Sequence, residues 1–177
     1  MLTISVVLMP NYSLCLSGDL MRLRDATTAD VSQMLKLEQE SSAAAHWGES
    51  SYQSFFKPSS APSFIRVAED DSRSNELRGF LIAGGVGDEW EIESLVVDPL
   101  FRRQGLGSCL VSDFMNAARE QGIRNVLLEV RESNEPARRL YEKIGFSIEG
   151  RRKDYYRNPN EDAILYRLSL RLCDKIS

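Results

Sequence analysis

The spacing of apolar residues predicts alternating strands and helices. A first strand is expected over residues 21–24, followed by a helix whose N-terminus can be capped by Thr28 or Asp30. Apolar side chains recur along one face of that helix, at Val31, Met34, Leu35 and Leu37. Residues 49–56 favour a second, short helix. The N-terminal third of the chain therefore reads as one strand and two helices.

A hairpin is predicted in the middle of the chain. Residues 64–68 are typical of a strand, and the polar residues 69–76 indicate a loop. Residues 80–83 and 90–97 predict two further strands, joined by a turn over residues 84–88. These two strands are expected to pair in antiparallel fashion.

A helix and a buried strand follow. Residues 105–121 have helical spacing and end at Gly122, a favourable C-terminal stop. The nearly continuous apolar run 125–130 is typical of a strand buried on both faces. Glu129 interrupts that run with a carboxylate, which makes it a candidate for chemistry.

The C-terminal region completes a single domain. A helix is expected over residues 136–145, and strands over 147–149 and 163–170, around a connection rich in arginine and tyrosine. We expect one domain over residues 21–177. Residues 1–20 are interpreted as an N-terminal extension or an over-long start assignment, with disorder as one alternative, and they are given no catalytic role.

Residues 102–108 (RRQGLGS) lie between the strand 90–97 and the helix after it. Gly105 and Gly107 let the backbone approach a ligand closely, and a helix N-terminus offers unpaired N–H groups with a partial positive charge. The loop is therefore a predicted anion site of a size suited to pyrophosphate. It lacks the Gly-Lys-Ser/Thr of a P-loop and the third glycine of a Rossmann turn.

Composition limits the classes of function. The chain has 177 residues, of which 42% are hydrophobic, and this length suits one well-buried domain. A net charge of −4 argues against a broad nucleic-acid surface. An anionic cofactor must then be held by a local basic pocket.

The three cysteines and one histidine exclude several site types. The cysteines are far apart and the histidine is alone, so we expect no disulfide framework, no metal site and no serine triad. The apolar run 2–9 is too short to span a membrane and is a poor signal peptide. A cytoplasmic protein is the resulting expectation.

Several ordered blocks resemble the RimI-type N-terminal acetyltransferases of the GNAT superfamily. The blocks carry the Arg-x-x-Gly-x-Gly loop after a Val-Asp-Pro turn, and further motifs on either side of it. These motifs are Leu37-Glu38-Gln39, Leu128-Glu129-Val130-Arg131-Glu132-Ser133-Asn134, Leu140-Tyr141-Glu142-Lys143-Ile144-Gly145-Phe146, Arg151-Arg152-Lys153-Asp154-Tyr155-Tyr156 and Glu161-Asp162-Ala163. Because they span residues 21–170 in order, they are more specific together than any one motif.

The resemblance implies an α/β GNAT fold, with a central, mostly antiparallel and splayed sheet covered by helices on both faces. It implies direct transfer of acetyl from acetyl-CoA to the α-amino group of a protein, with the N-terminal alanine of a small-subunit ribosomal protein as the family's best-known acceptor. A monomer or weak dimer is expected. The alternatives are a GNAT enzyme acting on a small-molecule amine and a non-catalytic module that binds acyl-CoA.

Two side chains match the family's catalytic positions. An amine attacks a thioester only when it is neutral, and neutralising an α-amine at pH 7 costs about 1 kcal/mol, compared with about 4.6 kcal/mol for lysine. The resemblance implies that Glu129 is the base, acting through water, and that Tyr141 is the acid. Glu91 is the rival base, and pairing of Glu129 with Arg131 or Arg152 is the structural alternative.

The family pattern also assigns residues to acetyl-CoA. The main chain of a bulged strand would hold pantetheine and the acetyl carbonyl, and the loop would hold pyrophosphate. The implied residues are Leu95, Val96, Val97, Arg103, Gln104, Gly105, Leu106, Gly107, Ser108 and Asn134. As alternatives, Arg102 and Arg103 are solvated surface charges and Asn134 is only a helix cap.

Aromatic residues are candidates for the acceptor side. The family pattern places Tyr155, Tyr156 and Arg152 near the peptide entrance, although tyrosines at a bend are also common packing residues. His46 and Trp47 form another possible peptide-facing pair. A single histidine is more often structural than catalytic, so His46 has no part in the expected mechanism.

Overall fold

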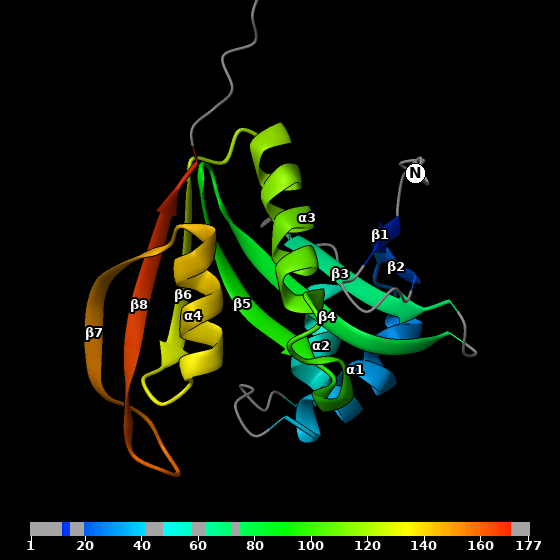
Figure 1. Ribbon diagram of the computed structural model, residues 1–177, viewed down its shortest axis with the longest axis horizontal. Coiled ribbons are helices and arrows are strands. Elements are labelled where there is room, and N and C mark those ends of the chain that lie inside the picture. The colour runs from blue at the N-terminus through cyan, green and yellow to red at the C-terminus, as the bar shows by residue number, and fades with distance from the viewer. Residues whose placement is uncertain (1–11, 15–19, 42–47, 58–62, 72–74, 171–177) are drawn as a thin grey trace, which may run out of the picture.

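A computed structural model describes residues 12–14, 20–41, 48–57, 63–71 and 75–170 (Figure 1). The strands are β1 (Tyr12–Leu14), β2 (Leu20–Asp25), β3 (Ser63–Asp70), β4 (Glu76–Val86), β5 (Glu89–Val97), β6 (Asn125–Arg131), β7 (Ser147–Tyr156) and β8 (Glu161–Ser169). The helices are α1 (Val31–Gln39), α2 (Glu49–Phe55), α3 (Leu106–Glu120) and α4 (Glu135–Ile144), with short 3-10 turns at Thr28–Asp30 and Pro99–Phe101. Among these helices, none is long and apolar enough to cross a membrane.

The described strands form one sheet in the order β1-β2-β3-β4-β5-β6-β8-β7. Among the described strand pairs only β5–β6 is parallel, because α3 carries the chain back across the sheet between these two strands. The predicted α/β class, with a mostly antiparallel sheet, is confirmed. Strand β1 lies within the predicted extension and pairs with β2, so part of residues 1–20 belongs to the sheet.

Two apolar clusters cover opposite faces of the sheet, as the helices in Figure 1 indicate. The larger cluster joins β5, β6 and β8 to α3 and α4, and includes Trp90, Phe114, Met115 and Tyr166. The smaller cluster joins α1 and α2 to β3, β4 and β5, and includes Met34, Tyr52 and Phe80. Helices on both faces are therefore confirmed.

The start of α1 agrees with one of the two predicted caps, because Asp30 is the N-cap residue of α1. Thr27, instead of Thr28, is the N-cap of a 3-10 turn that leads directly into the helix. The Asp30 carboxylate accepts the Thr27 backbone N–H at 2.7 Å and is held by Arg24 at 2.8 Å. A carboxylate three residues after a threonine cap closes the turn from its other side.

The predicted loop over residues 69–76 is wrong at both ends. Glu69 and Asp70 extend β3 and are only 4% and 5% exposed, and Glu76 already begins β4. Glu69 accepts from Arg24 at 2.9 Å, and Asp70 lies 3.5 Å from an Arg78 nitrogen. These carboxylates are paired across neighbouring strands, which polarity along the chain does not reveal.

Three other strand predictions need correction. Strand β4 continues to Val86, so the turn is shorter than residues 84–88. Along β6 the residues alternate between buried and half-buried, so the strand is not buried equally on both faces. The connection rich in arginine and tyrosine is the second half of β7. Pairing with β8 holds Arg151, Arg152 and Tyr156 in the strand, which their composition alone does not indicate.

Candidate active site

The site begins where β5 and β6 separate. The two strands pair from Glu89–Asn125 to Ile92–Leu128, and the described pairing ends there. On the other side of β5, Ile82 pairs with Ser94 and Ala83 with Ile92, so Glu93 is the extra residue of a β-bulge. A bulge bends its strand. Beyond this bulge, β5 is paired with β4 on one side, and its other edge, here called the open edge, has no described pairing with β6.

The bulge also reverses which side chains of β5 face each layer. Before it, Trp90 and Ile92 belong to the cluster beneath α3. After it, Val96 belongs to the cluster beneath α1, while Leu95 and Val97 pack on the α3 side. Without the extra residue, Leu95 would face the opposite layer.

A cavity of about 420 Å³ lies beside this open edge. Leu95 and Val97 of β5 form one wall, the N-terminal half of α4 forms another, and the glycine loop closes one end. The lining residues are Ser41, Leu95, Val97, Phe101, Arg102, Arg103, Gly105, Gly107, Ser108, Asn134, Pro136, Ala137 and Leu140. The cavity is thus apolar along its length and has backbone donors at its end.

The glycine loop has the backbone geometry that an anion site requires. Arg103 and Gly105 have positive φ values of 61° and 92°, and a positive φ is uncommon for a residue with a side chain. A Cβ at Gly107 would lie 3.3 Å from Leu140 and 3.7 Å from Val97. The first amides of α3 have no acceptor within the helix, so the loop fits a pyrophosphate group.

Most residues assigned to acetyl-CoA line this cavity, and three do not. Val96 is 1% exposed in the other core cluster, and the Leu106 side chain is buried under α3. The Gln104 side-chain amide donates to the Leu100 carbonyl at 2.9 Å. Val96 and Leu106 can therefore contribute only backbone groups.

Asn134 is both the cap of a helix and a lining residue of the cavity. Its Oδ1 accepts the Ala137 N–H at 3.3 Å as the N-cap of α4, and the residue also lines the cavity. Sequence reasoning missed Ser41, Phe101, Pro136, Ala137 and Leu140. The spacing of Pro136 and Leu140 could have indicated two of them, because residues four positions apart lie on the same face of a helix.

Glu129 lies on β6 just beyond the last β5–β6 pair. Its Oε1 is 2.8 Å from Arg152 Nη1, and its side chain is 16% exposed. Arg152, instead of Arg131, is therefore the cation that pairs with Glu129. The carboxylate also faces Tyr155, whose pKa is raised by burial and then by Glu129.

Glu91 lies near Glu129 on the neighbouring strand. Burial raises the pKa of Glu91, the Glu129 carboxylate raises it further, and Arg152 opposes both. Glu91 pairs with Leu127 in the β5–β6 ladder, two residues before Glu129 on β6. The two candidate bases are therefore coupled, and Arg152 is the cation that acts on both.

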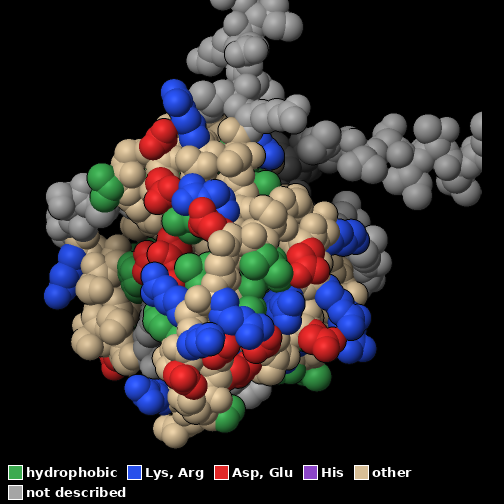
Figure 2. Space-filling view, turned by 90° about the vertical axis from the view of Figure 1, so that its left-hand side faces the viewer, with side chains coloured by type: hydrophobic (Ala, Val, Ile, Leu, Met, Phe, Trp, Pro, Cys, Tyr) green, Lys and Arg blue, Asp and Glu red, His purple; other side chains and the backbone are tan. Residues whose placement is uncertain are grey.

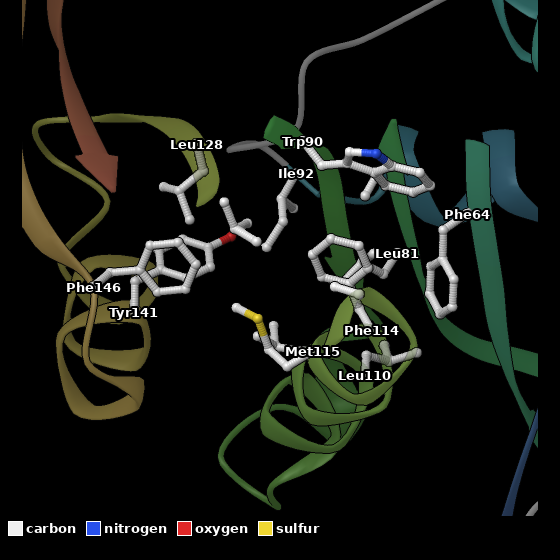
Figure 3. Close-up of a cluster of buried hydrophobic side chains, with 14 of the residues drawn as sticks. Phe64, Leu81, Trp90, Ile92, Leu110, Phe114, Met115, Leu128, Tyr141 and Phe146 are labelled. Atoms are coloured by element: carbon white, nitrogen blue, oxygen red, sulfur yellow. The ribbon is translucent and has the colours of Figure 1, made fainter. Parts of the chain in front are cut away.

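Tyr141 does not line the cavity. It is 6% exposed and packs against Phe146, with 5.6 Å between ring centroids. In Figure 3 its ring points into the cluster, on the side of Leu128 and Ile92, where the β5–β6 pairing ends. Burial, and then the nearby Tyr156, raises the pKa of Tyr141 above its usual range. The phenol therefore stays protonated and able to donate.

The end of β7 brings aromatic and cationic groups next to Glu129. The Arg131 guanidinium lies 4.2 Å from the ring centroid of Tyr156, and that of Arg152 lies 5.3 Å from Tyr155. Burial and then Glu129 raise the pKa of Tyr156 to about 12. His46 and Trp47, the other predicted acceptor-side pair, lie outside the described residues.

The surface over β7 and α4 is mixed in charge, as Figure 2 shows. Arg151 pairs with Glu132 and with Asp162, and Arg167 pairs with Glu149 at 2.6 Å. Opposite charges alternate and neutralise one another on this face.

Comparison with known proteins identifies the family. The model of the acetyltransferase (GNAT) family matches residues 29–146, which is more than half of the chain. The chain belongs to the GNAT acetyltransferase family. The matched range contains the glycine loop, Glu129 and Tyr141, and the family uses acetyl-CoA as acetyl donor.

Two relatives from the GNAT family have the same name. The [ribosomal protein bS18]-alanine N-acetyltransferase of Escherichia coli is 35% identical over 56% of this chain and 68% of its own length. The enzyme of that name from Salmonella typhimurium is 31% identical over 81% of this chain and 94% of its own. Both similarities extend beyond the loop, so this GNAT protein is an N-acetyltransferase.

Solved GNAT structures share the fold. The ribosomal-protein-S18-alanine N-acetyltransferase from Escherichia coli superposes with a TM-score of 0.74 at 27% identity, covering 89% of this chain and 98% of its own. Ard1 from Thermoplasma volcanium gives a TM-score of 0.75 at 26% identity, covering 85% and 98%. The predicted GNAT fold is confirmed.

Proposed function

We propose that this enzyme transfers acetyl from acetyl-CoA to the α-amino group of an N-terminal alanine, with ribosomal protein bS18 as the acceptor. The observation that carries the proposal is the opening of the sheet at Ile92–Leu128. It puts the cavity on one side of the open β5 edge and Glu129 just beyond the last strand pair. The relatives named for bS18 supply the identity of the acceptor.

Acetyl-CoA supplies the acetyl group as an activated thioester. In the proposed arrangement the amides of Gly105–Ser108 hold its pyrophosphate, and Leu95 and Val97 contact the pantetheine arm along the open edge of β5. Asn134 and Leu140 form the facing wall. Arg103 adds a positive charge at the mouth of the cavity.

Glu129 and Tyr141 divide the proton transfers between them. Glu129 takes a proton from the incoming ammonium through one water molecule, which leaves a neutral amine. The amine then forms the new C–N bond to the acetyl carbonyl carbon as the C–S bond breaks. Tyr141 gives its phenolic proton to the departing sulfur, and the proton that the new amide nitrogen must lose returns to the phenolate through water. The raised pKa of Tyr141 supports its role as donor because the proton is retained at neutral pH.

Mass spectrometry of acetylated peptides tests the acceptor. We expect a peptide with the bS18 N-terminus to be acetylated once, at its α-amine. The same peptide with a blocked N-terminus and a free lysine is the control, and we expect no product from it. Acetylation of small amines alone, such as a polyamine or an amino acid, would refute the proposed acceptor.

Three matched variants test the base. Glu129→Gln is expected to lower kcat by about 10²- to 10⁴-fold, the usual contribution of general acid–base catalysis. Glu91→Gln and Arg152→Met are expected to retain most of kcat, because neither group takes the proton. If Arg152→Met were as inactive as Glu129→Gln, Glu129 would act only as the structural partner of Arg152.

A further inference from the structure

Arg102 connects three parts of the site through one side chain. Its Nε donates to the Val97 carbonyl at 3.1 Å, and its Nη2 donates to Ser41 Oγ at 3.1 Å. Val97 ends β5 and Ser41 follows α1, so the glycine loop is tied to both elements. Ser41 is only 6% exposed, and its N–H donates to the Glu38 carbonyl at 2.9 Å.

The Val97 carbonyl faces the open edge of β5. The N–H of Asp98 donates to the Arg78 carbonyl on β4 at 2.8 Å. In a planar trans peptide the C=O and the following N–H point in opposite directions, so the Val97 C=O points away from β4. Arg102 therefore occupies the end of the same edge along which the proposed function places the pantetheine arm.

The two hydrogen bonds use the geometry of a guanidinium as well as its charge. A guanidinium presents several N–H donors in a fixed plane and can bind two acceptors at once, whereas a lysine ammonium is a flexible point charge. Both acceptors of Arg102 are neutral oxygens, and both of their residues line the cavity. A lysine at this position would keep the charge and lose the simultaneous contacts.

We propose that Arg102 is a positioning residue that holds α1 against the end of β5, and that its charge does not serve as a ligand for the cofactor's phosphates. This inference rests on the proposed function for the identity of the cofactor. Arg102 fixes the Ser41 end of α1 and the open edge of β5 in one geometry. The cavity wall formed by Leu95 and Val97 and the Ser41 end of α1 are then positioned together.

Substitutions at Arg102 separate geometry from charge. We expect Arg102→Lys and Arg102→Met to weaken acetyl-CoA binding to a similar degree, by about two- to tenfold, the range expected for one or two exposed hydrogen bonds. Both variants should also raise the KM of the acceptor peptide, because α1 is released. Arg119→Met makes the same charge change on an exposed part of α3 and should bind acetyl-CoA as the wild type does.

Ser41→Ala completes a double-mutant cycle. We expect it to weaken acetyl-CoA binding in the wild-type background and to have no further effect in the Arg102→Met background, because the shared contact is already lost. The same cycle in the free energy of unfolding needs neither cofactor nor acceptor. It therefore tests the Arg102–Ser41 contact even if no N-terminal peptide is acetylated.

Two results would overturn the inference. One is wild-type affinity in Arg102→Lys together with weaker, less salt-dependent binding in Arg102→Met, which would make Arg102 a charge ligand for phosphate. The other is full additivity of Ser41→Ala and Arg102→Met in both cycles, which would show that the two side chains act independently.

Discussion

Replacing Arg78 by methionine should destabilise the protein and distort the entrance to the glycine loop. Arg78 lies on β4 with a side chain only 12% exposed, 3.1 Å from Asp98 and 3.5 Å from Asp70, whose side chains are 9% and 7% exposed. Its guanidinium also lies 4.7 Å from the ring centroid of Phe101, a residue of the cavity wall. One buried cation thus neutralises two buried carboxylates and supports the turn before the loop.

The expected loss follows from the burial of these groups. Removing one partner of a buried ion pair leaves a desolvated charge and costs about 3–5 kcal/mol, and the lost contact with Phe101 adds about 0.5–1 kcal/mol. The third partner, Glu76, is 57% exposed and contributes little. A total loss of about 3.5–6 kcal/mol is a large part of the stability of a typical domain.

Urea unfolding followed by the fluorescence of the buried Trp90 measures this loss as a change in midpoint at constant slope. Arg139→Met is the matched control, because its pair with Glu135 is 77% and 67% exposed and should be worth less than about 0.5 kcal/mol. If Arg78→Met does not fold, Asp98→Asn tests the same ion pair with a smaller expected loss of stability. A loss for Arg78→Met below about 1 kcal/mol, or equal to that of the control, would refute the reasoning.

Three further predictions concern the loop, the first turn and the proposed acid. Gly105→Ala should lose about 1–2 kcal/mol of stability and bind acetyl-CoA more weakly, because the φ of Gly105 is 92°. Gly150→Ala is the control and should lose much less, because a Cβ at Gly150 would meet open space. Urea unfolding measures the stability, and calorimetry measures the binding of acetyl-CoA. Burial opposes ionisation of Asp30, but hydrogen bonds from Arg24 and Thr27 outweigh it and lower its pKa. That stability is present above a pH of about 4 and is lost as pH falls through the folded pKa, so Asp30→Asn should flatten the acid limb of the unfolding free energy. Tyr141→Phe should lower kcat by about 10²-fold or more with little change in KM. Because the pKa of Tyr141 is raised, the kcat of the wild type should not fall through ionisation of this phenol up to about pH 10. Equal kcat for both proteins would contradict its role as the acid.

Local features of the chain were the most predictable. The glycine loop was identified because a strand, a turn and a helix N-terminus follow one another within a few residues, and helix amides converge wherever such a junction forms. Helix α3 ends at Glu120, two residues before Gly122, and α4 ends at Ile144, directly before Gly145, and both glycines have the positive φ expected after a helix. These features depend on neighbours in the chain, so sequence order is sufficient to find them.

Features that join distant segments were not predictable in the same way. Glu69 and Asp70 were interpreted as loop residues because their charges suggested exposure, whereas arginines on neighbouring strands neutralise them. Ser41 gave no signal at all, since its role depends on Arg102, 61 positions later. Such pairs are specified by strand order and register, which a pattern along one chain does not encode.

The sequence by itself determined the family and the place of the glycine loop, and it marked Glu129 and Tyr141 as candidates, because each is carried by a short motif whose chemistry is local. Only the tertiary structure decided how these parts meet. The bulge at Glu93 opens the sheet beside Ile92, and this places the cavity on one side of β5 and the carboxylate just beyond the last β5–β6 pair. A single extra residue in one strand has that effect because side chains alternate with a period of two, so one insertion changes the face of every residue that follows it.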